Sequence, residues 1–163
     1  MLLLAVGYWY WSRLPANDRL IHGLMSAPLP SYVHTTMPLG KPEILSNDKD
    51  ADPGQVAQVL FPARKLRDDE AFMVQVFRNN AEARSSYDQS RRSDTKGSLQ
   101  AGARVGNLAD NTGYCLRNAR GVFACRALVG RAVATLIAPT GEPQTVGIAA
   151  TEAVVQYLEL LPQ

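Results

Sequence analysis

A chain of 163 residues with 46% hydrophobic and 20% charged residues has an ordinary globular composition, which excludes a wholly disordered or fibrous protein. The formal net charge of +2 is too small to indicate a nucleic-acid partner. The charge is uneven, however, because residues 78–131 contain ten Lys and Arg against four Asp and Glu. Such a segment is typical of a solvated face, and it also suits anionic lipid headgroups or an anionic envelope polymer.

Residues 1–14 predict a membrane anchor that is incomplete. Aliphatic side chains come first and consecutive aromatic ones follow, namely Leu2, Leu3, Leu4, Tyr8, Trp9, Tyr10 and Trp11. This order is typical of the end of a transmembrane helix, where aromatic rings lie at the headgroup level. The uncharged segment would span only about 16 Å as a helix, against a hydrocarbon core of roughly 30 Å. We therefore expect a helix that begins upstream or is buried against a partner protein, with a strand of the soluble core as the alternative.

Residues 15–54 predict an extended connector that is rich in proline. Within it, residues 17–25 are expected to form a short helix, because Asn17 is a suitable cap and apolar side chains follow at helical spacing. Residues 26–42 are expected to lie as extended chain over a surface. Residues 46–54 form a polar loop that ends in an Asp-Pro-Gly turn.

Residues 55–163 predict an α+β domain, in which an antiparallel sheet has helices packed on one face. The apolar residues 55–61 suit a short helix or a strand. Residues 70–78 alternate between two faces, with Phe72 and Val74 on one of them, which predicts a strand.

A helix is expected to follow this strand. Asn79 and Glu82 have the spacing of a capping box in which Asn replaces the usual Ser or Thr. The helix is expected to fade near residues 90–93, because residues 89–102 are polar and include Gly and Ser, which favours a mobile loop.

The last third of the chain predicts further strands and a closing helix. The apolar residues 122–137 contain Gly130, which is expected to bend this run or to separate two strands. Residues 146–161 have an apolar stripe at helical spacing, which predicts an amphipathic helix.

Cys115 and Cys125 are predicted to pair across a β-hairpin. If Gly121 takes the left-handed position of a three-residue loop, the two cysteines face each other, and directly opposed residues lie within disulfide range. A two-residue loop would instead place Cys115 opposite Ala124. A disulfide indicates an oxidising, extracytoplasmic compartment, whereas two buried free thiols are the alternative.

Catalytic, cofactor and metal signatures are absent from the sequence. The only histidines are His22 and His34, and neither accompanies a nucleophile motif. Asp48, Asp50 and Asp52 could contact Ca²⁺, but they lack the Gly and the distal Glu of an EF-hand, so a solvated loop is expected. We therefore predict a protein that is not an enzyme and that has no cofactor and no metal site.

The second half of the chain resembles small extracytoplasmic domains of actinobacterial membrane-anchored proteins and lipoproteins. The resemblance covers about residues 70–161 and rests on Gly106, Leu108, Ala109, Asp110, Cys115, Cys125 and the apolar run to Ile137. Domains of that group are generally non-catalytic or uncharacterised, so the resemblance implies an extracytoplasmic location more than an activity. No lipobox Cys follows the apolar N-terminal segment, which favours a helical anchor.

These observations predict a non-catalytic accessory subunit of a membrane protein assembly, with membrane proteins and lipid as its partners and no nucleic acid. One alternative is a ligand-sensing or envelope-binding ectodomain. Its anionic partner would meet a basic surface that contains Arg84, Arg91, Arg92, Arg117 and Arg120. The other alternative is an enzyme with an unrecognised site.

Overall fold

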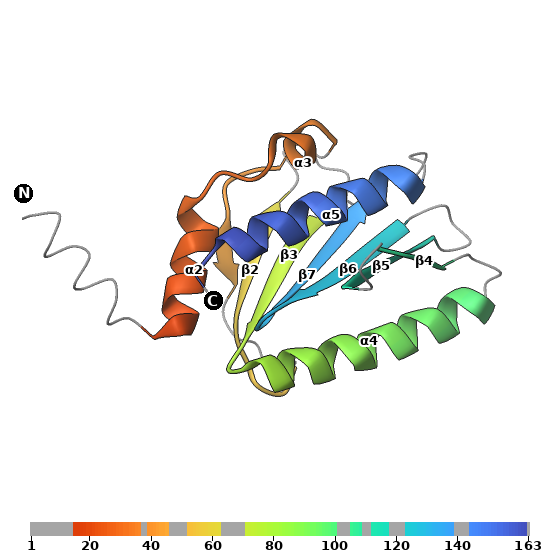
Figure 1. Cartoon of the computed structure of the whole chain (residues 1–163), viewed down its shortest axis with the longest axis horizontal. Coiled ribbons are helices and arrows are strands. Elements are labelled where there is room, and N and C mark those ends of the chain that lie inside the picture. The colour runs from red at the N-terminus through yellow and green to blue at the C-terminus, as the bar shows by residue number, and fades with distance from the viewer. Residues whose placement is uncertain are drawn as a thin grey trace, which may run out of the picture.

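The computed structural model describes residues 15–36, 39–45, 52–62, 71–100, 105–108, 112–117, 123–138 and 144–162. Within these ranges the chain forms a seven-stranded antiparallel sheet with the order β1-β2-β3-β7-β6-β5-β4 (Figure 1). The strands are β1 (Glu43–Leu45), β2 (Gln55–Pro62), β3 (Ala71–Phe77), β4 (Val105–Asn107), β5 (Gly113–Arg117), β6 (Phe123–Val129) and β7 (Ala132–Ala138). The helices are α2 (Ala16–Ser26), α3 (Ser31–Thr36), α4 (Asn80–Gln100) and α5 (Gln144–Leu160).

The α+β class and the antiparallel sheet are confirmed, and the helices lie on both faces of the sheet. Helices α2, α3 and α5 cover one face, whereas α4 covers the opposite face (Figure 1). We had expected helices on one face only. The second layer forms because the strands carry apolar side chains on both faces: Phe77, Leu128 and Val133 point toward α4 and are buried with Tyr87 of that helix.

The larger core lies between the sheet and α5. Val74 and Leu136 of the central strands pack with Val154 and Leu158 of α5, and all four side chains are buried. The faces of β3 are as predicted, since Phe72, Val74 and Val76 belong to this core. The apolar stripe of α5 therefore takes the place expected for the closing helix.

The described part of residues 15–54 is not an extended connector. Helix α2 forms where residues 17–25 predicted it, and its Leu20 and Leu24 are fully buried in the main core. Asn17 is not its cap: the helix begins at Ala16 after Pro15, and Asn17 Oδ1 instead accepts a hydrogen bond from Arg131 at 2.8 Å. Val33 of α3 and Leu39 are buried in the same core. The prolines punctuate this segment but do not keep it on the surface, because the apolar side chains between them gain more by burial against the sheet and α5. The predicted loop at residues 46–51 lies outside the described residues.

Helix α4 is longer than predicted. Its start is as expected, because the backbone N–H of Glu82 donates a hydrogen bond to Asn79 Oδ1 at 2.9 Å. The helix does not end near residues 90–93 but continues to Gln100. The prediction was wrong because high polarity resembles a loop, although no proline interrupts the segment and polar side chains on an exposed helix remain solvated.

The cysteine hairpin has the predicted register. Strands β5 and β6 pair with Cys115 opposite Cys125 and Leu116 opposite Ala124, and an S–S bond of 2.02 Å joins the cysteines. The hairpin loop at residues 118–122 is not among the described residues. Gly130, at a φ of 55°, forms the tight turn between β6 and β7, which confirms that it separates two strands.

The predicted anchor at residues 1–14 lies outside the part of the chain that the structure describes. Among the described helices, none combines the length and the apolar character needed to cross a membrane.

Candidate functional site

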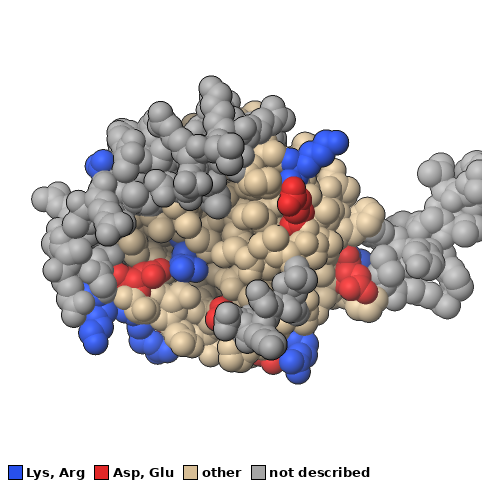
Figure 2. Space-filling model, turned by 180° about the vertical axis from the view of Figure 1, so that it is seen from behind, with Lys and Arg blue, Asp and Glu red and all other residues tan. Residues whose placement is uncertain are grey.

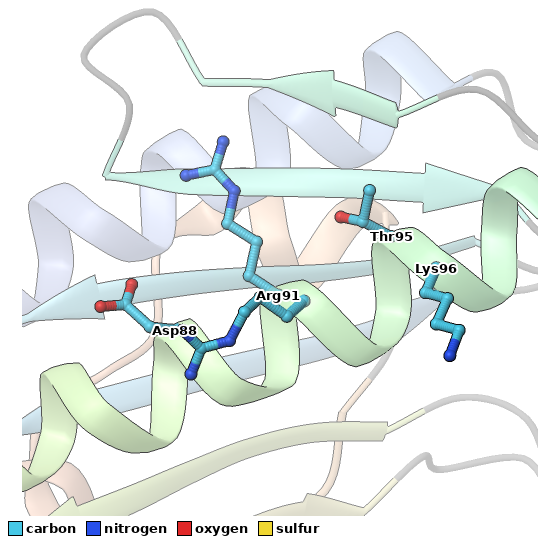
Figure 3. Close-up of a pocket in the computed structure, with 5 residues that line it drawn as sticks. Asp88, Arg91, Thr95 and Lys96 are labelled. Atoms are coloured by element: carbon cyan, nitrogen blue, oxygen red, sulfur yellow. The ribbon is translucent and has the colours of Figure 1, made fainter.

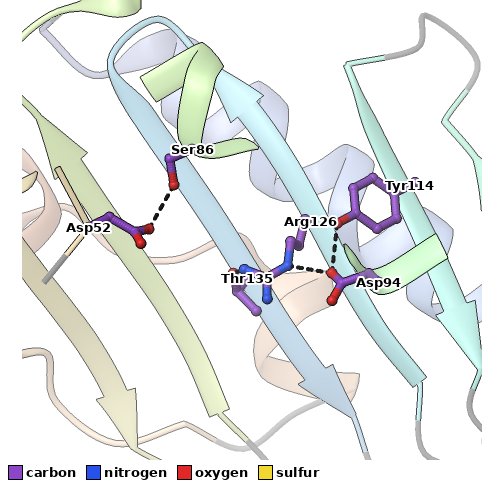
Figure 4. Close-up of polar contacts among 6 residues, drawn as sticks. All are labelled: Asp52, Ser86, Asp94, Tyr114, Arg126 and Thr135. Carbon is purple, nitrogen blue, oxygen red and sulfur yellow. Dashed lines mark hydrogen bonds and ion pairs between the residues drawn. The ribbon is translucent and has the colours of Figure 1, made fainter. Parts of the chain in front are cut away.

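The interface between α4 and the sheet contains a polar cluster centred on Asp94 (Figure 4). The Asp94 carboxylate accepts hydrogen bonds from the Tyr114 hydroxyl at 2.7 Å and from Arg126 Nε at 2.8 Å. Arg126 Nη1 also donates to Thr135 Oγ1 at 3.1 Å. These contacts connect α4 with β5, β6 and β7. Because they are charge-assisted and about three-quarters shielded from water, they hold the helix in one position on the sheet.

A second polar cluster holds the first half of α4. Asp52 Oδ2 accepts a hydrogen bond from Ser86 Oγ at 2.7 Å (Figure 4). It accepts a second one from Gln75 Nε2 at 3.2 Å. Gln75 also donates to Gln55 Oε1 at 2.7 Å. The sequence places Asp52 in the acidic loop that could contact Ca²⁺. In the structure, its Oδ2 accepts hydrogen bonds from two side chains of the protein. Asp48 and Asp50 are not among the described residues.

Tyr114 lies at the centre of the α4 interface and remains a hydrogen-bond donor. Burial raises the pKa of Tyr114 far above its ordinary value, and the hydrogen bond to Asp94 raises it further. The ring of Tyr114 packs against that of Tyr87, with 5.7 Å between ring centroids. The Tyr114 ring is therefore neutral and held in place, and it lies next to the turn of α4 that contains Arg91.

Arg91 rests on that ring. Its Cζ atom lies 5.7 Å from the Tyr114 ring centroid, and its Nη2 donates to Asn107 Oδ1 of β4 at 3.0 Å. Both partners are uncharged, and no ion pair to Arg91 occurs in the described part of the chain. The guanidinium is thus fixed in place while its charge is not neutralised, which is a suitable arrangement for binding an anion.

Arg91 lines an open groove with a volume of about 570 Å³. The described lining residues all belong to α4, namely Asp88, Arg91, Arg92, Thr95 and Lys96. Figure 3 shows that Arg91 and Lys96 extend from α4 in different directions. Seen from behind, Lys and Arg side chains follow the lower edge of the molecule, at the level where α4 runs (Figure 2).

The predicted basic surface is divided by the fold. Arg84, Arg91 and Arg92 lie on α4, as one helical stripe. Arg117 follows Leu116, which points toward α4, and so lies on the opposite face of β5. Arg120 is in the hairpin loop outside the described residues.

Sequence reasoning missed the residues that complete the groove. Asp88, Thr95 and Lys96 were assigned to the end of a helix and a loop, and Tyr114 and Asn107 were not considered. The available signal was the spacing of charged residues by three and four positions from Arg84 to Lys96, which is typical of one helix face.

Neither histidine belongs to a catalytic arrangement that the structure describes. His22 is exposed on α2, where its Nδ1 lies 3.4 Å from Ser26 Oγ. His34 lies in α3, and its side chain is not described. Among the described residues, no three His, Cys, Asp or Glu side chains are grouped so that they could hold a metal ion.

Comparisons with known proteins give one similarity of fold. Neither a protein-family model nor a curated protein sequence matches the chain. The crystal structure of the extracellular domain of PknH from Mycobacterium tuberculosis matches with a TM-score of 0.57 and 15% identity. The match covers 89% of this chain and 97% of that domain. The chain therefore shares the fold of that domain over nearly the whole length of both.

Proposed function

We propose that this chain is a non-catalytic extracytoplasmic ectodomain that binds an anionic ligand along α4. Its N-terminal segment would tether it to the membrane, as the order of residues 1–14 predicts. Two features support the location. A disulfide persists in oxidising compartments, and the shared fold is that of an extracellular domain.

The observation that carries the proposal is the arrangement of Arg91. An exposed arginine normally loses side-chain entropy when it is ordered around a ligand. Here Asn107 and the Tyr114 ring already hold the guanidinium, and neither neutralises it. Arg92 and Lys96 add two further positive charges to the groove lining, and no hydrogen bond or ion pair joins either of them to another residue in the described ranges.

Binding to polyphosphate and to phosphatidylglycerol vesicles tests this proposal. With the full chain we expect binding that weakens as the salt concentration rises, because salt screens exposed charges. Arg91→Ala and the pair Arg92→Ala with Lys96→Ala should each weaken it. Lys41→Ala is the matched control, since it removes one exposed positive charge away from α4. Binding that is independent of salt, or equally weakened by Lys41→Ala, would contradict the proposal.

An accessory-subunit role is the second candidate, and exposed apolar side chains favour it. Leu160 of α5 is 86% exposed and Ile44 of the edge strand β1 is 53% exposed. Such side chains contribute to binding when a partner covers them. After extraction in mild detergent, the full chain should migrate with a membrane assembly, and Leu160→Glu with Ile44→Glu should release it. A chain that is always extracted as a solitary monomer would rule out this role.

A further inference from the structure

We propose that the α4 groove binds a phosphorylated carbohydrate, that is, a phosphate monoester on a carrier with several hydroxyl groups. This inference rests on the proposed function and names the class of ligand for the same site.

The charge of the described part of the groove lining fits a dianion. Its described lining contains the cations Arg91, Arg92 and Lys96 and the single carboxylate of Asp88, which leaves an excess of two positive charges. A phosphate monoester carries about −1.5 to −2 charges at neutral pH. A carboxylate or a phosphodiester, with one negative charge each, would leave part of the excess unpaired.

The donors also fit a phosphoryl group. A guanidinium presents N–H groups in a planar fork that matches two oxygens of a phosphate. The fork of Arg91 is already held by Asn107 through one nitrogen, which leaves other N–H groups available to a ligand. Thr95 adds a hydroxyl donor and Lys96 an ammonium group to the groove lining.

Asp88 explains why a carrier with hydroxyl groups is expected. A carboxylate in the lining repels a bare anion, because like charges at short range disfavour binding. The same carboxylate accepts hydrogen bonds from hydroxyl groups, and charge-assisted bonds of this kind are strong. The groove, at about 570 Å³, is within the usual range for small-molecule sites and far exceeds the size of one phosphate group.

Calorimetry on the full chain tests the ligand class with four soluble probes. Glucose 6-phosphate should bind more tightly than inorganic phosphate, and also more tightly than glucuronate, which has one negative charge. Glucose should not bind measurably. Arg91→Lys should weaken glucose 6-phosphate by up to about tenfold, because the charge remains but the fork is lost.

Asp88→Asn is the decisive variant, because it should change the affinities for the two phosphates to different extents. Removal of the carboxylate should tighten binding of inorganic phosphate and should reduce the preference for glucose 6-phosphate. Lys41→Ala, outside the groove, should change neither affinity. A wild-type protein that binds the sugar phosphate no better than phosphate, or an Asp88→Asn variant with unchanged preference, would overturn the inference.

A parallel measurement distinguishes a lipid headgroup from a free sugar phosphate as the ligand. Vesicles that contain phosphatidylinositol 4-phosphate present the same groups on a lipid, whereas glucose 6-phosphate is free in solution. Tight binding to either one, sensitive to Arg91→Lys, supports the inference and identifies the source. Salt-dependent binding to polyphosphate without preference for either sugar phosphate would overturn this inference but leave the proposed function intact. Absence of all anion binding would overturn both.

Discussion

The two faces of the sheet are built from different kinds of contact. The face under α5 is a continuous apolar core that also contains the disulfide. Among the described residues of this face, Thr151 is the buried polar one, and its hydroxyl donates a hydrogen bond to the Gly147 carbonyl. The face under α4 has a smaller apolar cluster and two polar clusters, centred on Asp94 and Asp52. Apolar burial is strong but not directional, whereas hydrogen bonds fix orientation.

This difference indicates a division of roles within one domain. The α5 side supplies most of the stability, because it buries more of the large apolar side chains. The α4 side contributes less stability but positions Arg91 through Tyr114 and Asp94. Substitutions on the two sides should therefore have different consequences for unfolding and for binding.

The largest expected effect is on the α5 side. Leu136→Ala should lower the free energy of unfolding by about 3–4 kcal/mol, because the side chain is almost fully buried and its removal leaves a cavity. The same change at Leu128, which points toward α4, should cost about 2 kcal/mol, since that residue is slightly more exposed and has a smaller cluster around it. Urea denaturation measures both. Equal losses would contradict the division of roles.

Removal of the disulfide should cost slightly less. A Cys115→Ala, Cys125→Ala double variant should lose about 2.5–3 kcal/mol, because the cross-link closes a short loop and restricts the unfolded chain. The denaturation midpoint should fall and binding of polyphosphate at low denaturant should persist, since Arg91 lies on the other face. An unchanged midpoint, or binding that is lost while the variant remains folded, would count against this prediction.

Alkaline pH should affect both faces through one buried tyrosine each. Burial raises the pKa of Tyr157, on the α5 side, to about 12, and it raises that of Tyr114 further. Because the unfolded chain loses these protons near pH 10, the contribution of the two tyrosines to stability should be constant below pH 10 and should fall between pH 10 and 12. Tyr157→Phe should reduce this fall by about 2 kcal/mol. Denaturation of both proteins at pH 9 and at pH 12 measures this loss of stability. A loss of equal size in the wild type and in Tyr157→Phe would refute the prediction.

A smaller effect on stability is expected at Asp94. Asp94→Asn should cost about 1–2 kcal/mol, because the Arg126 guanidinium loses its carboxylate partner. Asp88→Asn, on the solvent side of the same helix, should change stability by less than about 0.5 kcal/mol. A double-mutant cycle with Arg126→Gln measures the coupling between Asp94 and Arg126. A coupling energy near zero would show that the cluster does not hold α4.

The sheet was the most predictable part of the fold. Alternation identified the faces of β3, and the turn chemistry around Gly121 placed Cys115 opposite Cys125. These features depend on local sequence, because strand periodicity and hairpin loops are set within a few residues. The buried role of α2 was not predictable in the same way, since Leu20 and Leu24 are covered only by residues distant in the sequence.

The candidate site was only partly predictable for the same reason. Three of the predicted arginines share α4, because a helix brings together residues spaced by three and four positions. The contacts that distinguish Arg91 from Arg92 come from β4 and β5, and no local pattern in the chain links Arg91 with Asn107 or Tyr114. Their proximity depends on where the polar helix docks, which is determined by the Asp94 and Asp52 clusters.

The position of the disulfide beneath α5 has a consequence for biogenesis. Both sulfur-bearing residues are fully buried, and Thr151 of α5 lies against Cys115, with 3.8 Å between Oγ1 and Sγ. An oxidant can reach two thiols in that position only while the helix is away from the sheet. Oxidation of the hairpin is therefore expected to precede docking of α5 on the sheet. Docking of α5 then protects the bond from exchange with external thiols until the helix opens again.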